Sequence, residues 1–221
     1  EKVDTTNPEA YEFYLKGKDK YEKRENTDDI EIVRGLLNKA IELDGNLISA
    51  KVLLGITFKG MGDYDKAMEI FTPALKQAQE LGDKRGIGAS LNNIGNVYSI
   101  KGDNDKAMDY YERALAIRKE IGNKNWMTES LHAIGNVYYD KGDYDSALDY
   151  YGRSLAVYEE IGEKKGMGYC LNNIGSVHIN KGDYDKTLDY LERSLAIAEE
   201  IGDKRGMGLS LHSIGLVYWN K

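Results

Sequence analysis

The sequence contains few of the residues that form covalent links or chemical centres: one cysteine, two prolines and three histidines in 221 residues. Cys170 is the single cysteine and cannot form a disulfide within the chain, so we expect a reduced, cytoplasmic setting. No stretch approaches the roughly 18 consecutive apolar residues of a membrane span, and the opening residues lack the apolar core of a signal peptide. The composition therefore predicts a soluble chain that does not bind a membrane.

An excess of basic residues is also missing, because 30 Lys and Arg stand against 37 Asp and Glu, giving a formal net charge of -7. Proteins that bind nucleic acids through their phosphates usually have a basic face, so we expect no nucleic-acid partner. The charged residues are mixed in sign and do not form blocks, which argues against disordered tails. The charge balance therefore predicts a folded chain that does not bind nucleic acid.

What the sequence does contain is an internal repeat with a period of 40 residues. A helix-like segment with apolar residues at i, i+3 and i+7, such as Leu91, Ile94 and Tyr98, precedes a Gly-Asp segment, and a second helix-like segment follows it. The glycine predicts the end of the first helix in the left-handed conformation, and the following aspartate, such as Asp103, predicts the N-cap of the second. The copies of this turn start at Gly62, Gly102, Gly142 and Gly182.

Repeated glycines inside the first helices predict how the two helices of a hairpin pack. A glycine destabilises a helix by roughly 1 kcal/mol relative to alanine, so its recurrence indicates a close approach of the second helix. We expect Tyr98 and Tyr138 to fill the complementary space, and Pro73 to kink the second helix of its hairpin or to unpair one of its turns. One hairpin cannot bury both of its faces, so the sequence predicts an all-α fold of antiparallel helix pairs stacked into a right-handed superhelical solenoid. The glycines are Gly95, Gly135 and Gly175.

The repeat resembles the tetratricopeptide repeat, and the resemblance covers about residues 46–221. The period is similar to that of the long-helix branch of this family, which includes the kinesin light chain and the Pins-type polarity adaptors. The opening of the chain also resembles the segment that leads into repeat arrays of larger bacterial regulatory proteins, those attached to nucleotide cyclases. In the best-matching copy the pattern is met by Leu91, Ile94, Gly95, Tyr98, Ala107, Tyr111 and Ala114.

The resemblance divides the chain into successive repeats of one continuous solenoid domain. The predicted boundaries are 1–45 for a divergent first repeat, 46–84, 85–124, 125–164 and 165–204 for repeats two to five, and 205–221 for the first helix of an incomplete sixth. Leu211, Ile214 and Val217 on that last helix have no following helix to cover them, so we expect an exposed apolar stripe and a longer array.

Residues for catalysis or metal binding do not gather at any point of the repeat. His132 and His212 occupy the same repeat position two periods apart, too far to share a metal ion. The segment Gly86–Gly88 lacks the strand and the third glycine of a dinucleotide site. Acidic pairs such as Asp109 and Glu112 stand among basic residues at helical spacing, as on a solvated helix face. We therefore expect no enzyme activity, no metal ion and no cofactor.

The first helix of each repeat has a second stripe that is free of core residues, and this stripe is the candidate binding site. Asparagine is a mediocre helix former, so its recurrence on the stripe needs another reason. A side-chain amide both donates and accepts hydrogen bonds and can bind the backbone of an extended peptide. The family resemblance implies this role most directly for Asn96 and Asn136. The candidate peptide-binding residues are Asn92, Asn96, His132, Asn136, Tyr139, Asn172, Ser176 and His212.

Some of these amides could instead join neighbouring first helices, and we expect this role for Asn93 and Asn173 beside the stripe. The stripe has no Lys or Arg, which disfavours a ligand held by a carboxylate clamp. The sequence favours a noncatalytic protein-interaction module that binds a peptide segment of its partner along a concave groove lined by the first helices. Two alternatives stay open: a ligand-sensing regulatory array of a larger signalling protein, and a self-assembling scaffold that pairs through its C-terminal end.

Overall fold

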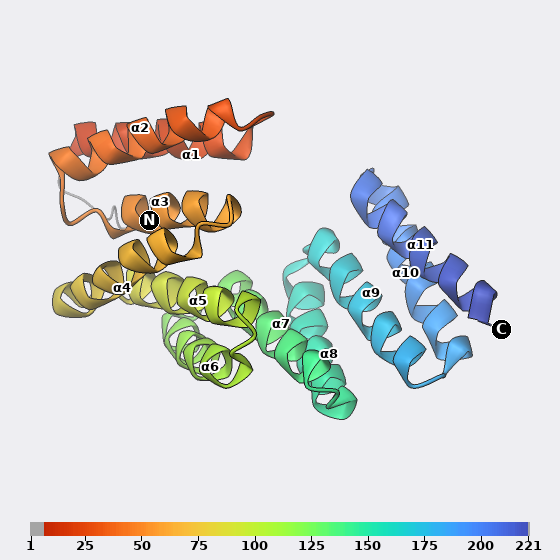
Figure 1. Cartoon of the computed structure of the whole chain (residues 1–221). Helices are drawn as coiled ribbons and strands as arrows, with labels where there is room; N and C mark the ends of the chain where they lie inside the picture. Colours follow the sequence, from red (N-terminus) through yellow and green to blue (C-terminus); the bar gives the residue numbers. More distant parts are fainter. Residues whose placement is uncertain (1–6, 221) are drawn as a thin grey trace. The chain divides into compact units, whose positions relative to one another are not determined.

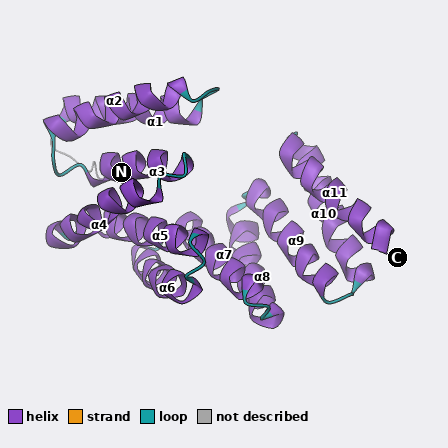
Figure 2. Cartoon of the chain, in the orientation of Figure 1, coloured by secondary structure: helices purple, strands orange, loops and turns teal. Residues whose placement is uncertain are grey.

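The structure is a computed structural model that describes residues 7–220, with the side chain of residue 220 excepted. Predictions that concern residues 1–6 and 221, at the two ends of the first and last predicted repeats, lie outside the described residues. Within residues 7–220 the chain forms eleven helices and no strand, so the predicted all-α class is confirmed. Figures 1 and 2 show how the helices follow one another along the chain. No helix in this described part is both long and apolar enough to cross a bilayer.

The chain divides into two compact units, residues 1–117 and residues 118–221. In the first unit each helix contacts the next from α1 to α5, and α3 also contacts α5. Its core contains Leu37 and Leu47 near the beginning and Phe71 and Ile94 further along. The helices of this unit are α1 (Pro8–Glu22), α2 (Asp28–Leu43), α3 (Ile48–Gly60), α4 (Tyr64–Leu81), α5 (Lys84–Ile100) and α6 (Asn104–Ile121), whose last turn belongs to the second unit.

In the second unit each helix again contacts the next, and α9 also contacts α11. Its core is built around Tyr151, Leu171 and Val177, which are almost completely buried. Antiparallel hairpins therefore stack within each unit in the manner of a helical-repeat solenoid. The helices of this unit are α7 (Lys124–Asp140), α8 (Tyr144–Ile161), α9 (Lys164–Asn180), α10 (Tyr184–Ile201) and α11 (Lys204–Asn220).

The turns between helices follow the prediction. Gly102 has a φ of +79° and ends α5 in the left-handed conformation, where glycine has no steric penalty. The side chain of Asp103 then accepts a 3.2 Å hydrogen bond from the backbone N–H of Lys106 and caps α6. Glycine with positive φ recurs at every 20th residue of the array, at Gly62, Gly82, Gly102, Gly122, Gly142, Gly162, Gly182 and Gly202.

The mid-helix glycines do allow the second helix to approach, but the side chain that uses the space is not the expected one. A Cβ added to Gly95 would lie 2.7 Å from the ring of Tyr111, which belongs to α6. The prediction that Tyr98 fills this space is wrong, because Tyr98 lies nearer the hairpin turn and stacks on Tyr110 at 5.5 Å between ring centroids. Tyr138 likewise stacks on Tyr150. The same close approach recurs at Gly55 with Phe71, Gly135 with Tyr151 and Gly175 with Leu191.

Helix α4 continues through Pro73, which is exposed, so the backbone carbonyl that loses its helical partner can be hydrated. One further feature differs from the expectation. On α11 the predicted apolar stripe is only partly exposed: Leu211 is 56% exposed and Ile214 is half-buried, but Val217 is fully buried. Val217 therefore belongs to the core of the second unit.

Candidate functional site

In the first unit the candidate stripe lies on α5. Asn92 is buried, whereas Asn96 is half-buried. The hydroxyl of Tyr111 donates a 2.8 Å hydrogen bond to Oδ1 of Asn96. The ring of the same tyrosine lies against Gly95, so one side chain both packs the hairpin and fixes the orientation of the neighbouring amide.

The second unit repeats this arrangement on α7 and α8. The hydroxyl of Tyr151 donates a 2.7 Å hydrogen bond to Oδ1 of Asn136, and its ring lies against Gly135. Burial raises the pKa of Tyr151, so its hydroxyl stays protonated and remains a donor. Since Oδ1 is occupied in both units, the amide group of each asparagine is held with its two N–H donors available, and within residues 7–220 no acceptor for Asn96 or Asn136 is present.

His132 and Tyr139, also on α7, make contacts between hairpins. Nε2 of His132 is hydrogen-bonded to the amide of Asn173 on α9, and its ring lies 5.5 Å from that of Tyr151. Burial lowers the pKa of His132, which favours the neutral imidazole. The hydroxyl of Tyr139 accepts a 2.7 Å hydrogen bond from the amide of Asn180. The stripe of α7 is thus fixed to α9 by two pairs of polar side chains.

The roles predicted for Asn93 and Asn173 as bonds between repeats are confirmed. Asn173 pairs with His132, as described above. Oδ1 of Asn93 on α5 accepts a 2.9 Å hydrogen bond from Nζ of Lys59 on α3. Polar side chains beside the stripe therefore tie successive first helices together within each unit.

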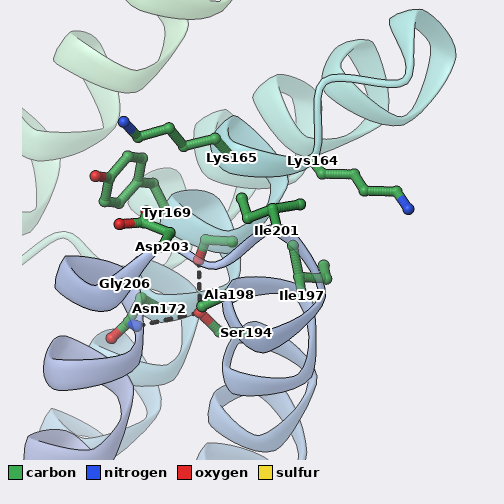
Figure 3. A pocket seen from close by; sticks show the side chains of 11 residues that line it. Lys164, Lys165, Tyr169, Asn172, Ser194, Ile197, Ala198, Ile201, Asp203 and Gly206 are labelled. Carbon is green, nitrogen blue, oxygen red and sulfur yellow. Dashed lines mark hydrogen bonds between the residues drawn. The ribbon is translucent and has the colours of Figure 1, made fainter.

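The structure places the three candidates farther along the second unit in different environments. Asn172 is 8% exposed, and its amide donates to the hydroxyls of Ser194 at 3.1 Å and Ser210 at 2.7 Å. Figure 3 shows this side chain directed at Ser194. Ser176 donates to the backbone carbonyl of Asn172, and His212 is exposed on α11. Of these, only His212 has a side chain that is open to solvent.

The pocket drawn in Figure 3 lies where α9, α10 and α11 meet, and Tyr169 and Asn172 are among its lining residues. Its volume is about 10 Å³, which is about the space of a single water molecule. It is too small for a peptide or a cofactor. We regard it as a packing space beside the hydrogen bonds of Asn172.

Tyr111 and Tyr151 were not among the sequence candidates, although the sequence contains a signal for them. Where the residue after the mid-helix glycine is asparagine, the residue 15 positions later is tyrosine, as in the pairs Asn96–Tyr111 and Asn136–Tyr151. In the hairpins that lack this asparagine the same positions hold Ile56 with Phe71 and Ser176 with Leu191. Among positions 71, 111, 151 and 191, a phenolic hydroxyl therefore occurs only in the hairpins whose first helix has an asparagine that can accept its hydrogen bond.

Cys170 and Asp109 both make contacts with neighbouring side chains. Cys170 is fully buried, its Sγ lies 3.5 Å from the hydroxyl of Ser154, and burial raises the pKa of its thiol to about 11. Asp109 forms an exposed ion pair with Arg113 one helical turn away. Within the described part of the chain no three His, Cys, Asp or Glu side chains are grouped as a metal site would require.

The hairpins, the left-handed glycine joints and the polar stripe define a helical-repeat protein. The chain belongs to the tetratricopeptide repeat family, whose members are generally noncatalytic interaction modules: the family model matches residues 46–120, 109–160, 126–178 and 167–220. The predicted family is confirmed. The comparison with curated protein sequences finds no match.

Solved structures show the same fold at low sequence identity. BtubC (BKLC) from P. vanneervenii is 21% identical with a TM-score of 0.70, over 97% of this chain and 84% of that one. A putative kinesin light chain of Podosopora anserina with nearly identical TPR-like repeats is 12% identical with a TM-score of 0.64, over 88% and 97%. A signal transduction ATPase of Pyrococcus horikoshii with a tetratricopeptide repeat sensor is 17% identical with a TM-score of 0.71, over 97% and 38%.

Proposed function

We propose that each unit binds an extended peptide segment of a partner protein, with the amide of Asn96 as the backbone-recognition group in the first unit and that of Asn136 in the second. The observation that supports this most is the recurrence of the tyrosine–asparagine pair in both units. A peptide carbonyl can accept from the N–H donors that Tyr111 and Tyr151 leave available, whatever side chain the ligand residue has. His132 and Tyr139 flank Asn136 on the same helix and complete the proposed site in the second unit.

The asparagine amides are ordered before a ligand binds, because buried tyrosines hold them in place. Ordering a long side chain on binding would cost about 0.5–1.5 kcal/mol, and this cost is reduced when the side chain is ordered beforehand. We leave Asn172 out of the proposed site because its two donors already bond to Ser194 and Ser210. Ser176 and His212 remain at its edge.

A peptide-display selection on the whole chain tests the proposal, followed by affinity measurements with the enriched peptide. The informative variant carries Asn96→Asp and Asn136→Asp, since a carboxylate still accepts from the tyrosine hydroxyl but has lost both N–H donors. We expect this variant to bind at least tenfold more weakly, which corresponds to about 1.4 kcal/mol. An enriched peptide that binds the variant as well as the parent, or the absence of any enriched peptide, would contradict the proposal.

A second candidate, self-association, is favoured by the exposed apolar side chains of α11. Leu211 is 56% exposed, Leu216 41% and Trp219 87%. Apolar groups gathered on one helix commonly mark an interaction surface. Sedimentation across a range of concentrations tests this candidate: a mass that rises with concentration in the parent, and not in Trp219→Lys, supports it, and a constant mass rejects it.

A further inference from the structure

The outer faces of three second helices share one arrangement of charged and aromatic side chains. On α6, the guanidinium of Arg113 lies 5.1 Å from the ring centroid of Tyr110 and 2.9 Å from a carboxylate oxygen of Asp109. Arginine fits this place because its planar cation can stack on an aromatic ring while it bonds to a carboxylate. The same trio occurs on α8 as Asp149, Tyr150 and Arg153, and on α10 as Asp189, Tyr190 and Arg193.

Helix α4 holds Pro73 at the position of these arginines. Glu69 supplies the carboxylate at the position of Asp109, and Ile70 stands at the position of Tyr110. Beside Pro73 a groove of about 590 Å³ lies open between α4 and the end of α5. The arginine that α6, α8 and α10 supply from their own chain is therefore missing on α4, where the groove has room for one. The groove is lined by Asp65, Met68, Glu69, Thr72, Pro73, Val97, Tyr98 and Lys101.

This groove is distinct from the asparagine stripe. At 100° per residue along α5, the lining residues Val97, Tyr98 and Lys101 lie on the side of the helix opposite Asn92 and Asn96. A ligand in the groove would therefore leave the stripe accessible. The two sites can be tested separately.

The charges at the groove favour a cation. Asp65 at one end is paired with Lys101 at 2.7 Å, so these two charges balance each other. Glu69 is exposed and forms no ion pair within residues 7–220, so it is the uncompensated charge of the lining. The whole chain has a net charge of -7, which adds long-range attraction for a basic partner.

The apolar part of the lining suits the stem of a long side chain. Met68 and Tyr98 are half-buried and present an apolar surface next to the carboxylate, and Val97 is buried beneath them. Arginine and lysine bury their methylene stems along such surfaces while the charged head stays in water. A guanidinium adds a bidentate contact with a carboxylate, which an ammonium cannot make.

We infer that the groove between α4 and α5 binds an arginine side chain presented by a basic segment of a partner protein. The side chain takes the place that Arg113, Arg153 and Arg193 fill in the other hairpins. Its methylenes lie along Met68 and Tyr98, and its guanidinium bonds to Glu69.

The test is an NMR titration of the full, uniformly labelled chain with N-acetyl-arginine amide, with N-acetyl-norleucine amide as the uncharged probe. We expect arginine amide to shift backbone resonances of the segments that line the groove, around residues 65–73 and 97–101, and norleucine amide to shift them at least fivefold more weakly at equal concentration. Equal shifts with the two probes, or shifts spread over the acidic surface without preference for these segments, would overturn the inference.

Two variants and one control make the result specific. Glu69→Gln removes the charge with little change of shape, and Pro73→Arg supplies the side chain that the other hairpins contain. Both should reduce the shifts at least fivefold. Glu112→Gln on the exposed face of α6 also removes one negative charge from the chain and should leave the shifts unchanged. The inference fails if Glu69→Gln and Glu112→Gln behave alike, and dispersed spectra of each variant confirm folding.

Discussion

The hydroxyl of Tyr151 lies 2.7 Å from Oδ1 of Asn136 while its ring lies against Gly135, the residue next to that asparagine. A packing contact and a polar contact are thus made by the same side chain. The glycine that admits the ring also places the hydroxyl within reach of the amide. Stability and the proposed recognition of a peptide are therefore linked at this position.

Replacement of this glycine by alanine should destabilise the second unit. A Cβ at position 135 would lie 2.6 Å from the ring of Tyr151, so Gly135→Ala should lower the free energy of unfolding by about 1–3 kcal/mol, although alanine is the better helix former. The matched control is Gly215→Ala, at the same repeat position in α11, where an added Cβ meets no atom within 4 Å. This control should raise stability by roughly 0.5–1 kcal/mol. Urea unfolding followed by circular dichroism would contradict the argument if both variants changed in the same direction.

Asn172 should matter for folding and not for binding. Asn172→Ala removes the donors to Ser194 and Ser210 inside a buried network, so we expect a loss of about 1–3 kcal/mol in the free energy of unfolding. Its affinity for a peptide selected on the parent should stay within twofold. Ser176→Ala serves as the control, since it deletes only a hydrogen bond to the preceding turn of its own helix. A tenfold loss of affinity in Asn172→Ala with unchanged stability would place Asn172 in the site after all.

Because of Cys170, the free energy of unfolding should decrease as the pH rises through the alkaline range. Burial raises the pKa of its thiol from 9.0 to about 11, so the folded state holds the proton where the unfolded state has released it. The free energy of unfolding should therefore be unaffected below about pH 9 and fall between about pH 9 and 11. At about 1.4 kcal/mol for each tenfold change in proton affinity, the loss is at most roughly 3 kcal/mol. Chemical unfolding of the parent and of Cys170→Ala across this range isolates the effect, and parallel curves would exclude it.

Arg118 at the end of α6 should not tolerate replacement by lysine. Its guanidinium is almost completely buried and donates to the backbone carbonyl of Trp126 at 2.7 Å and to the hydroxyl of Ser130 at 2.9 Å. Both bonds come from Nη1, whereas Nη2 lies 3.0 Å from Glu129. A lysine has one nitrogen in place of these two and cannot make all three contacts, so Arg118→Lys should lower the free energy of unfolding by about 1–3 kcal/mol. Glu129→Gln removes its ion-pair partner, which is 55% exposed, and should change stability by less than about 1 kcal/mol. If thermal unfolding shows Glu129→Gln to be less stable than Arg118→Lys, the ion pair with Glu129, and not the buried hydrogen bonds, stabilises this end of α6.

The hairpins, caps and joints could be predicted from the sequence because they depend on residues that are close along the chain. Gly102 and Asp103 act on the two helices that they separate, and a 40-residue period shows that all copies obey the same local rules. Repetition adds independent support to each assignment. This part of the prediction agrees with the structure down to the hydrogen bond of the cap.

The side-chain partners across a hairpin could not be predicted in the same way. Whether Tyr98 or Tyr111 faces Gly95 depends on how far the second helix is displaced along the first, and helical periodicity alone does not determine that displacement. Burial of Val217 and of Asn172 has the same origin, because each faces a neighbouring helix whose angle is set by packing. The paired occurrence of asparagine and tyrosine at a spacing of 15 residues was the one signal available for these contacts.

The left-handed glycine that ends almost every helix has a consequence for how such a protein can change over generations. Because the joints at Gly82, Gly122, Gly162 and Gly202 are interchangeable, a stretch of coding sequence duplicated in frame from one of them to the next would encode a hairpin that meets familiar neighbours on both sides. Recombination between the copies can therefore lengthen or shorten the protein by whole hairpins, because an added hairpin uses the packing contacts that already occur between repeats.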